Sequence, residues 1–143
     1  MPTLTVNKPN LQFEGPTIEV QFLLPAELEA KLRAEGQQIP PPVLNKALID
    51  TGASNCAVQE DIPKSLNLQP VDLITMTTPS GPVKCYRYFM RMFMPSHNII
   101  YQGIFTAVSG LVIQNIHCLV GRDLLAFSEF HYYGKQNQFT LTL

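Results

Sequence analysis

Proline and glycine constrain this chain more than any other feature of its sequence. Twelve prolines and eight glycines are spread over 143 residues, so the segments between them are short. Proline interrupts helices and central strands, and glycine favours turns. Sustained helical periodicity is correspondingly rare. The pattern therefore favours an all-β fold built from short strands and turns.

Composition and charge exclude several classes of protein. Hydrophobic residues make up 45% of the chain and charged residues only 15%, which is typical of one folded domain with its own core. Ten Lys and Arg residues against eleven Asp and Glu argue against a nucleic-acid partner, which usually requires a basic excess. No apolar run approaches the roughly 18 residues that span a bilayer. No signal peptide is recognisable, so we expect no membrane partner and a cytoplasmic location.

The first quarter of the chain changes character three times. Residues 1–16 are rich in turn formers and predict an N-terminal arm or edge segment, which leaves residues 17–143 as a single domain. Apolar and polar residues alternate over 17–24, which predicts a strand. Residues 25–36 begin with proline, end with glycine and contain strong helix formers, so we predict a short surface helix inserted there.

Most of the remaining chain alternates as strands do. One strand is expected at 43–49. The other expected elements are a long hairpin of residues 70–78 and 82–94, strands near 99–108 and 111–120, a short helix at 121–127, and a closing hairpin of 130–133 and 139–143. In the long hairpin, Met90 and Met92 share one face, predicted to be core, whereas Arg87 and Arg91 share the other, predicted to be solvated.

Cysteine and histidine give no indication of a metal site. Cys56, Cys85 and Cys118 are widely spaced and odd in number, which fits neither a disulfide framework nor a zinc site. We expect three reduced, buried thiols. The three histidines include no pair four residues apart, so neither a metal nor a cofactor is expected.

The stretch that carries chemistry is Ala-Leu-Ile-Asp-Thr-Gly-Ala-Ser at residues 47–54. Three apolar residues lead into Asp50, and a carboxyl group at the end of a buried strand is costly unless something pairs with it. Gly52 then permits another chain to approach the backbone closely. About seventy residues later, two hydrophobic residues precede Gly-Arg-Asp-Leu-Leu at residues 121–125.

These two motifs, in this order and at this separation, resemble the two signatures of retroviral-type (retropepsin-like) aspartic proteases. The resemblance covers about residues 17–143 and is closer to the cellular and bacterial relatives than to the viral enzymes, because of the helix at 25–36 and the C-terminal hairpin. It implies a closed, mostly antiparallel barrel with one or two short helices. It also implies cleavage of an extended peptide without a metal or cofactor.

Residue roles follow from the resemblance by position. Asp50 corresponds to the catalytic aspartate, and the active-site loop continues through Thr51, Gly52, Ala53 and Ser54. Thr51 would hydrogen-bond across a dimer beneath the active site. Gly52 and Ala53 would pair with the backbone of the substrate.

Other positions correspond to the surroundings of the site. The flap that covers the substrate would comprise Thr77, Thr78, Pro79, Ser80, Gly81, Pro82 and Val83. The walls of the substrate pocket would be Leu48, His117 and Leu119. A structural role would fall to Gly121, Arg122 and Asp123, with Asp123 facing the N-terminal N–H groups of the helix.

Two positions depart from the viral pattern. Viral flaps are rich in glycine, whereas this one carries Pro79 and Pro82, which predicts a stiffer flap. In viral enzymes the arginine at the position of Arg122 pairs with an acid, but Ser54 stands where that acid would be. The partner of Arg122 therefore stays open at this point.

Aspartic protease chemistry needs two carboxyl groups, and the chain contains a single such motif. An active site would therefore require a homodimer, with Asp50 of each copy at the two-fold axis. One alternative is a non-cleaving peptide-binding or dimerisation module on the same fold, and another is a monomeric barrel that binds a small apolar ligand. A nucleophilic pair of His117 and Cys118 is disfavoured, because neighbours on a strand point to opposite faces.

Overall fold

The computed structural model describes residues 2–143 and is mostly β. The strands of the described chain are β1 (Thr3–Asn7), β2 (Thr17–Leu23), β3 (Val43–Ile49), β4 (Ala57–Gln59), β5 (Asp72–Thr78), β6 (Gly81–Met94), β7 (Ile99–Val108), β8 (Cys118–Val120), β9 (Glu129–Tyr133) and β10 (Gln138–Thr142). The α-helices are α1 (Leu11–Glu14), α2 (Ala26–Ala34), α3 (Asp61–Ser65) and α4 (Arg122–Leu125), and the 3₁₀ helices are η1 (Leu111–Gln114) and η2 (Gly134–Gln136). None of the helices in this part of the chain is long and apolar enough to cross a membrane.

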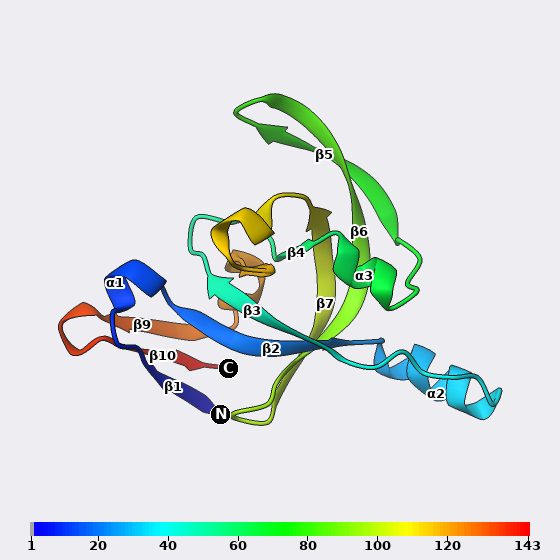
Figure 1. The fold of residues 1–143 in the computed structure, drawn as a ribbon, viewed down its shortest axis with the longest axis horizontal. Coiled ribbons are helices and arrows are strands. Elements are labelled where there is room, and N and C mark those ends of the chain that lie inside the picture. Colours follow the sequence, from blue (N-terminus) through cyan, green and yellow to red (C-terminus); the bar gives the residue numbers. More distant parts are fainter. Residues whose placement is uncertain (1) are drawn as a thin grey trace.

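The smaller sheet joins the two ends of the chain. Its order is β1-β10-β9, and every pairing is antiparallel. Thr3 lies opposite Thr142, so the two termini lie side by side (Figure 1). Residues 3–7 are thus an edge strand, one of the two forms that the sequence leaves open.

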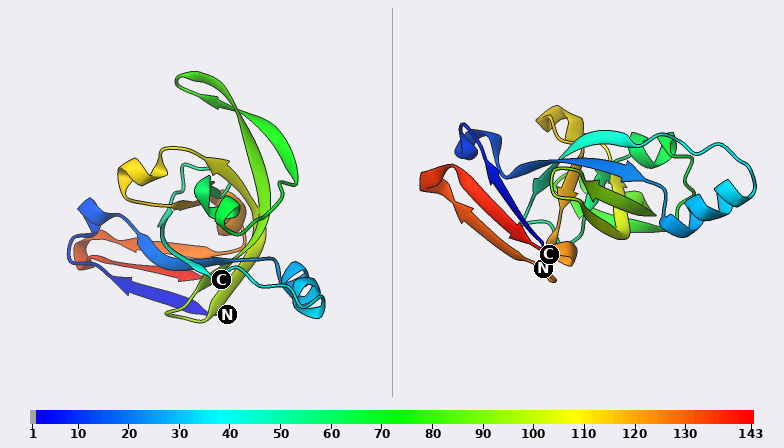
Figure 2. Two further views of the ribbon diagram at one scale, coloured as in Figure 1. Left: turned by 45° about the vertical axis from the view of Figure 1, so that its right-hand side comes forward. Right: turned by 90° about the horizontal axis from the view of Figure 1, so that it is seen from below.

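The larger sheet positions the candidate site. Its order is β2-β3-β8-β4-β7-β6-β5, and β2 also pairs with β6. The pairings β3–β8 and β4–β7 are parallel, and the others in this sheet are antiparallel. The hairpin of β5 and β6 projects beyond the rest of the sheet (Figures 1 and 2).

Buried side chains of the larger sheet and of the smaller sheet form one hydrophobic core. Met90, Met92 and Met94 of β6 are fully buried, as the alternation of this strand predicts. The ring of Phe22 meets that of Phe105 edge to face, with centroids 5.6 Å apart. Farther out on the same strand, in the projecting hairpin, Tyr86 is 51% exposed.

Two expectations about secondary structure are wrong, one about a strand and one about the number of helices. Residues 111–120 do not form one strand, because Gly110 and Asn115, both with positive φ, bracket the 3₁₀ helix η1 and leave only Cys118–Val120 extended. The described chain also has four α-helices instead of one or two. The helices α1 and α3 were missed because they are too short for periodicity to show, whereas α2 matches the helix predicted at 25–36.

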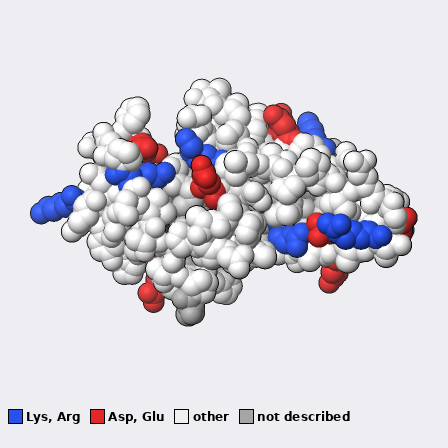
Figure 3. Space-filling view, turned by 60° about the horizontal axis from the view of Figure 1, so that its bottom comes forward, with Lys and Arg blue, Asp and Glu red and all other residues white. Residues whose placement is uncertain are grey.

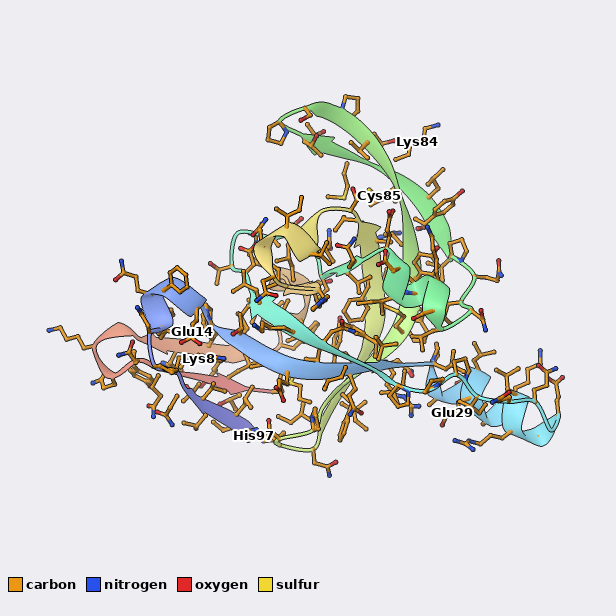
Figure 4. All side chains as sticks on the ribbon, in the orientation of Figure 1. Lys8, Glu14, Glu29, Lys84, Cys85 and His97 are labelled. Atoms are coloured by element: carbon orange, nitrogen blue, oxygen red, sulfur yellow. The ribbon has the colours of Figure 1, made fainter. Side chains whose placement is uncertain are left out.

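Neither arginine of β6 is freely solvated. The side chain of Arg91 is only 18% exposed, and its Nη2 atom lies 3.4 Å from Oε1 of Glu29 on α2 (Glu29 is labelled in Figure 4). Arg87 pairs with Asp72 across the base of the hairpin. The prediction of a solvated face is therefore wrong for Arg91, because α2 supplies a carboxylate that the local pattern does not show. Arg87 stays partly exposed beside Asp72.

Charged side chains are sparse on the surface. On the face shown in Figure 3, basic and acidic groups lie in small mixed clusters, and most of the surface between them is uncharged.

We predict that Phe105→Ala lowers the free energy of unfolding by about 3–5 kcal/mol, because it removes a fully buried ring and leaves a cavity. Urea denaturation monitored by circular dichroism measures this change. The matched control is Phe13→Ala, whose ring is 88% exposed and whose loss should change stability by less than about 0.5 kcal/mol. Equal effects of the two substitutions would contradict the described core.

Candidate active site

The strand β3 delivers Asp50 to the edge of the larger sheet. It pairs with β2 on one side and runs parallel to β8 on the other, with Ile49 opposite Val120. Ile49 is buried, and the backbone N–H of Asp50 donates to the carbonyl of Val120 at 3.0 Å. The backbone at Asp50 is thus fixed by the ladder, while its side chain is half-buried at the strand end.

The loop after β3 is a tight turn around the carboxylate. The N–H of Gly52 donates to Oδ1 of Asp50 at 2.8 Å, and the N–H of Ala53 donates to the carbonyl of Asp50 at 3.1 Å. A Cβ atom at position 52 would lie 3.0 Å from that same Oδ1, which explains why glycine stands there. Thr51, Gly52 and Ser54 are exposed, so the outer surface of the loop is accessible.

The helix α4 supports this loop from behind. The backbone N–H of Arg122 donates to the carbonyl of Ala53 at 2.8 Å, and its Nη1 atom donates to the carbonyl of Thr51 at 2.7 Å. The partner of Arg122, which the sequence leaves open, is therefore a backbone carbonyl. Gly121 permits the contact, because a Cβ atom there would lie 2.4 Å from the backbone of Asn55.

Asp123 ties α4 to the start of β4. Its carboxylate accepts the backbone N–H of Cys56, at 3.0 and 3.1 Å to its two oxygens, and the N–H of Leu124 at 2.8 Å. The thiol of Cys56 donates to the same carboxylate at 3.1 Å. Asp123 thus faces an N-terminal N–H group of its helix, as predicted, and also holds the far end of the active-site loop.

Cys56 is more than the small hydrophobic residue that the sequence predicts. Burial, together with the neighbouring Asp123 carboxylate, raises the pKa of its thiol to about 12, so the proton that it donates is retained. The three cysteines are free and buried, as expected. The polar role of Cys56 was missed because its partner lies 67 residues away in the sequence.

A cavity of about 300 Å³ lies beside the active-site loop. Its lining is uncharged and consists of Gly52, Ala53, Ser54, Asn55, Ala57, Ile74, Met76, Thr106, Val108 and Leu119. Ile74 and Met76 belong to β5, so the projecting hairpin forms one wall. Leu119, one of the three residues predicted to line a substrate pocket, also lines this cavity.

The other two predicted pocket residues lie elsewhere. Leu48 packs against Gly15, where an added Cβ atom would lie 3.0 Å from its Cδ1 atom. The ring of His117 accepts the backbone N–H of Lys46 through Nδ1, at 3.2 Å. Neither residue lines the first cavity, and their role as walls of a substrate pocket stays a prediction.

The hairpin tip coincides with the predicted flap. Thr78 lies opposite Gly81, and Pro79 and Ser80 form the exposed turn between them. The hydroxyl of Thr78 donates to the carbonyl of Gly81 at 2.6 Å. The remaining flap residues, Thr77, Pro82 and Val83, lie in the flanking strands.

An ion pair closes the base of this hairpin. Arg87 donates through Nε to Oδ1 of Asp72 at 2.8 Å, and this hydrogen bond lowers the pKa of the Asp72 carboxyl group. Asp72, Ile74 and Met76 lie on the same side of β5, since strand side chains alternate. The pair is therefore on the face of the hairpin that lines the cavity.

No protein-family model matches the chain, and no curated protein matches it in sequence. Within residues 2–143, no group of three or more His, Cys, Asp or Glu side chains could hold a metal ion. The arrangement offers one accessible carboxylate per chain, a turn of backbone N–H groups around it, and an uncharged cavity alongside.

We predict that Asp123→Ala destabilises the protein by about 2–3 kcal/mol, because it leaves the buried N–H of Cys56 without an acceptor. Asp123→Asn keeps a carbonyl oxygen there and should cost about 1 kcal/mol. Chemical denaturation of both variants measures the difference. Equal stability of Asp123→Ala and the wild type would show that this contact does not hold the loop.

Proposed function

We propose that this chain is a retropepsin-like aspartic endopeptidase that acts as a homodimer. The observation that carries the proposal is the position of Asp50, which lies at the end of an interior strand of the larger sheet, inside a tight turn and beside an uncharged cavity. The Gly-Arg-Asp segment packs directly behind that turn. Two motifs about seventy residues apart thus lie together around one carboxylate.

The strand pairings support the same fold. Since β2 pairs with β3 on one edge and with β6 on the other, the larger sheet can be interpreted as a closed barrel of the retropepsin-like type. The β5–β6 hairpin extends from that barrel beside the cavity, where a flap would cover a bound peptide (Figure 1).

The reaction requires a second copy of the chain. Two carboxyl groups held close together share one proton, because like charges at that distance cannot both ionise. Each chain supplies one Asp50, so the two must meet at a two-fold axis. The exposed surface of Thr51 and Gly52 next to Asp50 leaves room for that approach.

Hydrolysis then proceeds with the two Asp50 side chains in different states. The ionised carboxylate takes a proton from a water molecule, whose oxygen attacks the carbonyl carbon of the peptide bond. The protonated carboxyl group donates its proton to the carbonyl oxygen. When the carbon–nitrogen bond breaks, the leaving nitrogen takes up the proton that the first carboxylate received. A hydroxyl group of the diol intermediate returns a proton to the second carboxylate, so the pair again shares one proton.

We predict that Asp50→Asn abolishes peptide cleavage and leaves the dimer intact, because the amide neither ionises nor accepts the proton from water. Digestion of a peptide library from acidic to neutral pH measures cleavage, and sedimentation velocity measures association. Asp61→Asn on the exposed start of α3 is the matched control and should cut normally.

Cleavage by the Asp50→Asn variant at the wild-type rate would refute the proposal. If the wild type binds peptides but cuts none at any pH, the chain is a non-cleaving peptide-binding module.

We also predict that specific activity falls when the enzyme is diluted below its dimer dissociation constant. The monomer carries half of the catalytic pair and should be inactive. Initial rates over a dilution series, compared with sedimentation data at the same concentrations, test this expectation. Activity per chain that stays constant while the dimer dissociates would rule out a shared site.

A further inference from the structure

A second cavity, of about 310 Å³, adjoins β3 at Lys46, four residues before Asp50. Its lining residues are Lys8, Phe13, Glu14, Thr17, Lys46, Gln114, Asn115 and Ile116. Thr17 lies opposite Leu48, and the neighbouring carbonyl of Pro16 accepts the N–H of Ile49 at 3.0 Å. The first cavity adjoins the residues that follow Asp50, and this one adjoins the residues that precede it.

The two cavities differ in charge. No charged residue lines the first, whereas the second has two lysines and one glutamate. Lys8 and Lys46 are half-buried, and neither belongs to an ion pair of residues 2–143. Oε2 of Glu14 already accepts the backbone N–H of Asn10 at 3.0 Å. The second cavity therefore carries an excess of one positive charge.

Backbone hydrogen bonds hold the two lysines, Lys8 and Lys46, in place. Both backbone polar groups of Lys46 are bonded to His117. The N–H of His117 donates to the carbonyl of Lys46 at 2.9 Å, and the ring of His117 accepts the N–H of Lys46. Lys8 follows β1, and its N–H donates to the carbonyl of Asn137 at 2.8 Å. Figure 4 shows Lys8 and Glu14 in the region where β1 meets α1.

We infer that the substrate groove selects peptides with an uncharged side chain in the first cavity and an Asp or Glu side chain in the second, bound by Lys8 and Lys46. The inference rests on the proposed function. A carboxylate binds ammonium groups through charge-assisted hydrogen bonds, which are stronger than those between neutral groups. Phe13 and Ile116 supply apolar surface for the methylene groups of that side chain.

The test uses peptides with amidated C-termini, so that the only added carboxylate is a side chain. Matched peptides carry Glu, Gln or Lys at each position around the cleaved bond. We expect one position where Glu exceeds Gln in kcat/KM by about five- to tenfold at low salt, and where the preference weakens at high salt. Equal kcat/KM values for Glu and Gln at every position would overturn the inference and leave the protease assignment intact.

Variants identify the lysines. Combined Lys8→Gln and Lys46→Gln substitutions should abolish the preference, and Lys46→Glu should favour the peptide with Lys at that position. Lys135→Gln, on exposed η2, is the matched control and should keep the wild-type preference. A preference that survives the double substitution would also overturn the inference.

A binding measurement separates the two proposals. Fluorescence anisotropy with the Asp50→Asn variant reports peptide affinity without cleavage. If the wild type cuts no peptide, the proposed function fails. The charge preference is then judged on affinity alone, where a Glu preference that depends on Lys8 and Lys46 supports the inference, and equal affinities overturn it.

Discussion

The parallel pairing of β3 with β8 is the contact on which the candidate site depends. Two strands that run in the same direction end at the same edge, so Asp50 and Gly121 leave the sheet side by side although they are 71 positions apart. An antiparallel pairing would send these segments to opposite edges. Everything around the carboxylate follows from this geometry, including the contacts of Arg122 with Thr51 and of Asp123 with Cys56.

These contacts hold the active-site loop within a single chain. Its turn is formed by hydrogen bonds to Asp50 itself, and its two ends are held by α4 and by the ladder to Val120. A second copy would therefore meet a loop that is already ordered. An ordered loop reduces the conformational entropy lost on association, which favours a pre-formed site over one assembled on contact.

Local patterns in the sequence predict the elements that can be recognised without knowing which segments they contact. The alternation of β2, β3 and β6 and the composition of α2 identify these elements without knowledge of their neighbours. The motif around Asp50 identifies the turn for the same reason. Predictions fail where a distant segment decides the outcome. The carboxylate that holds Arg91 comes from a helix 62 residues earlier, and the carboxylate that accepts the thiol proton of Cys56 lies 67 residues later. Alternation assigns Leu48 to a face but does not say which cavity lies on that face.

The antiparallel contact between β1 and β10 has a consequence for how the chain folds. Thr3 and Thr142 pair across almost the whole sequence, so β1 cannot join its sheet before β10 is available. Until then Leu4, which is 1% exposed in the finished protein, has no cover. A chain cut between β9 and β10 would leave that leucine without its strand partner, Leu141.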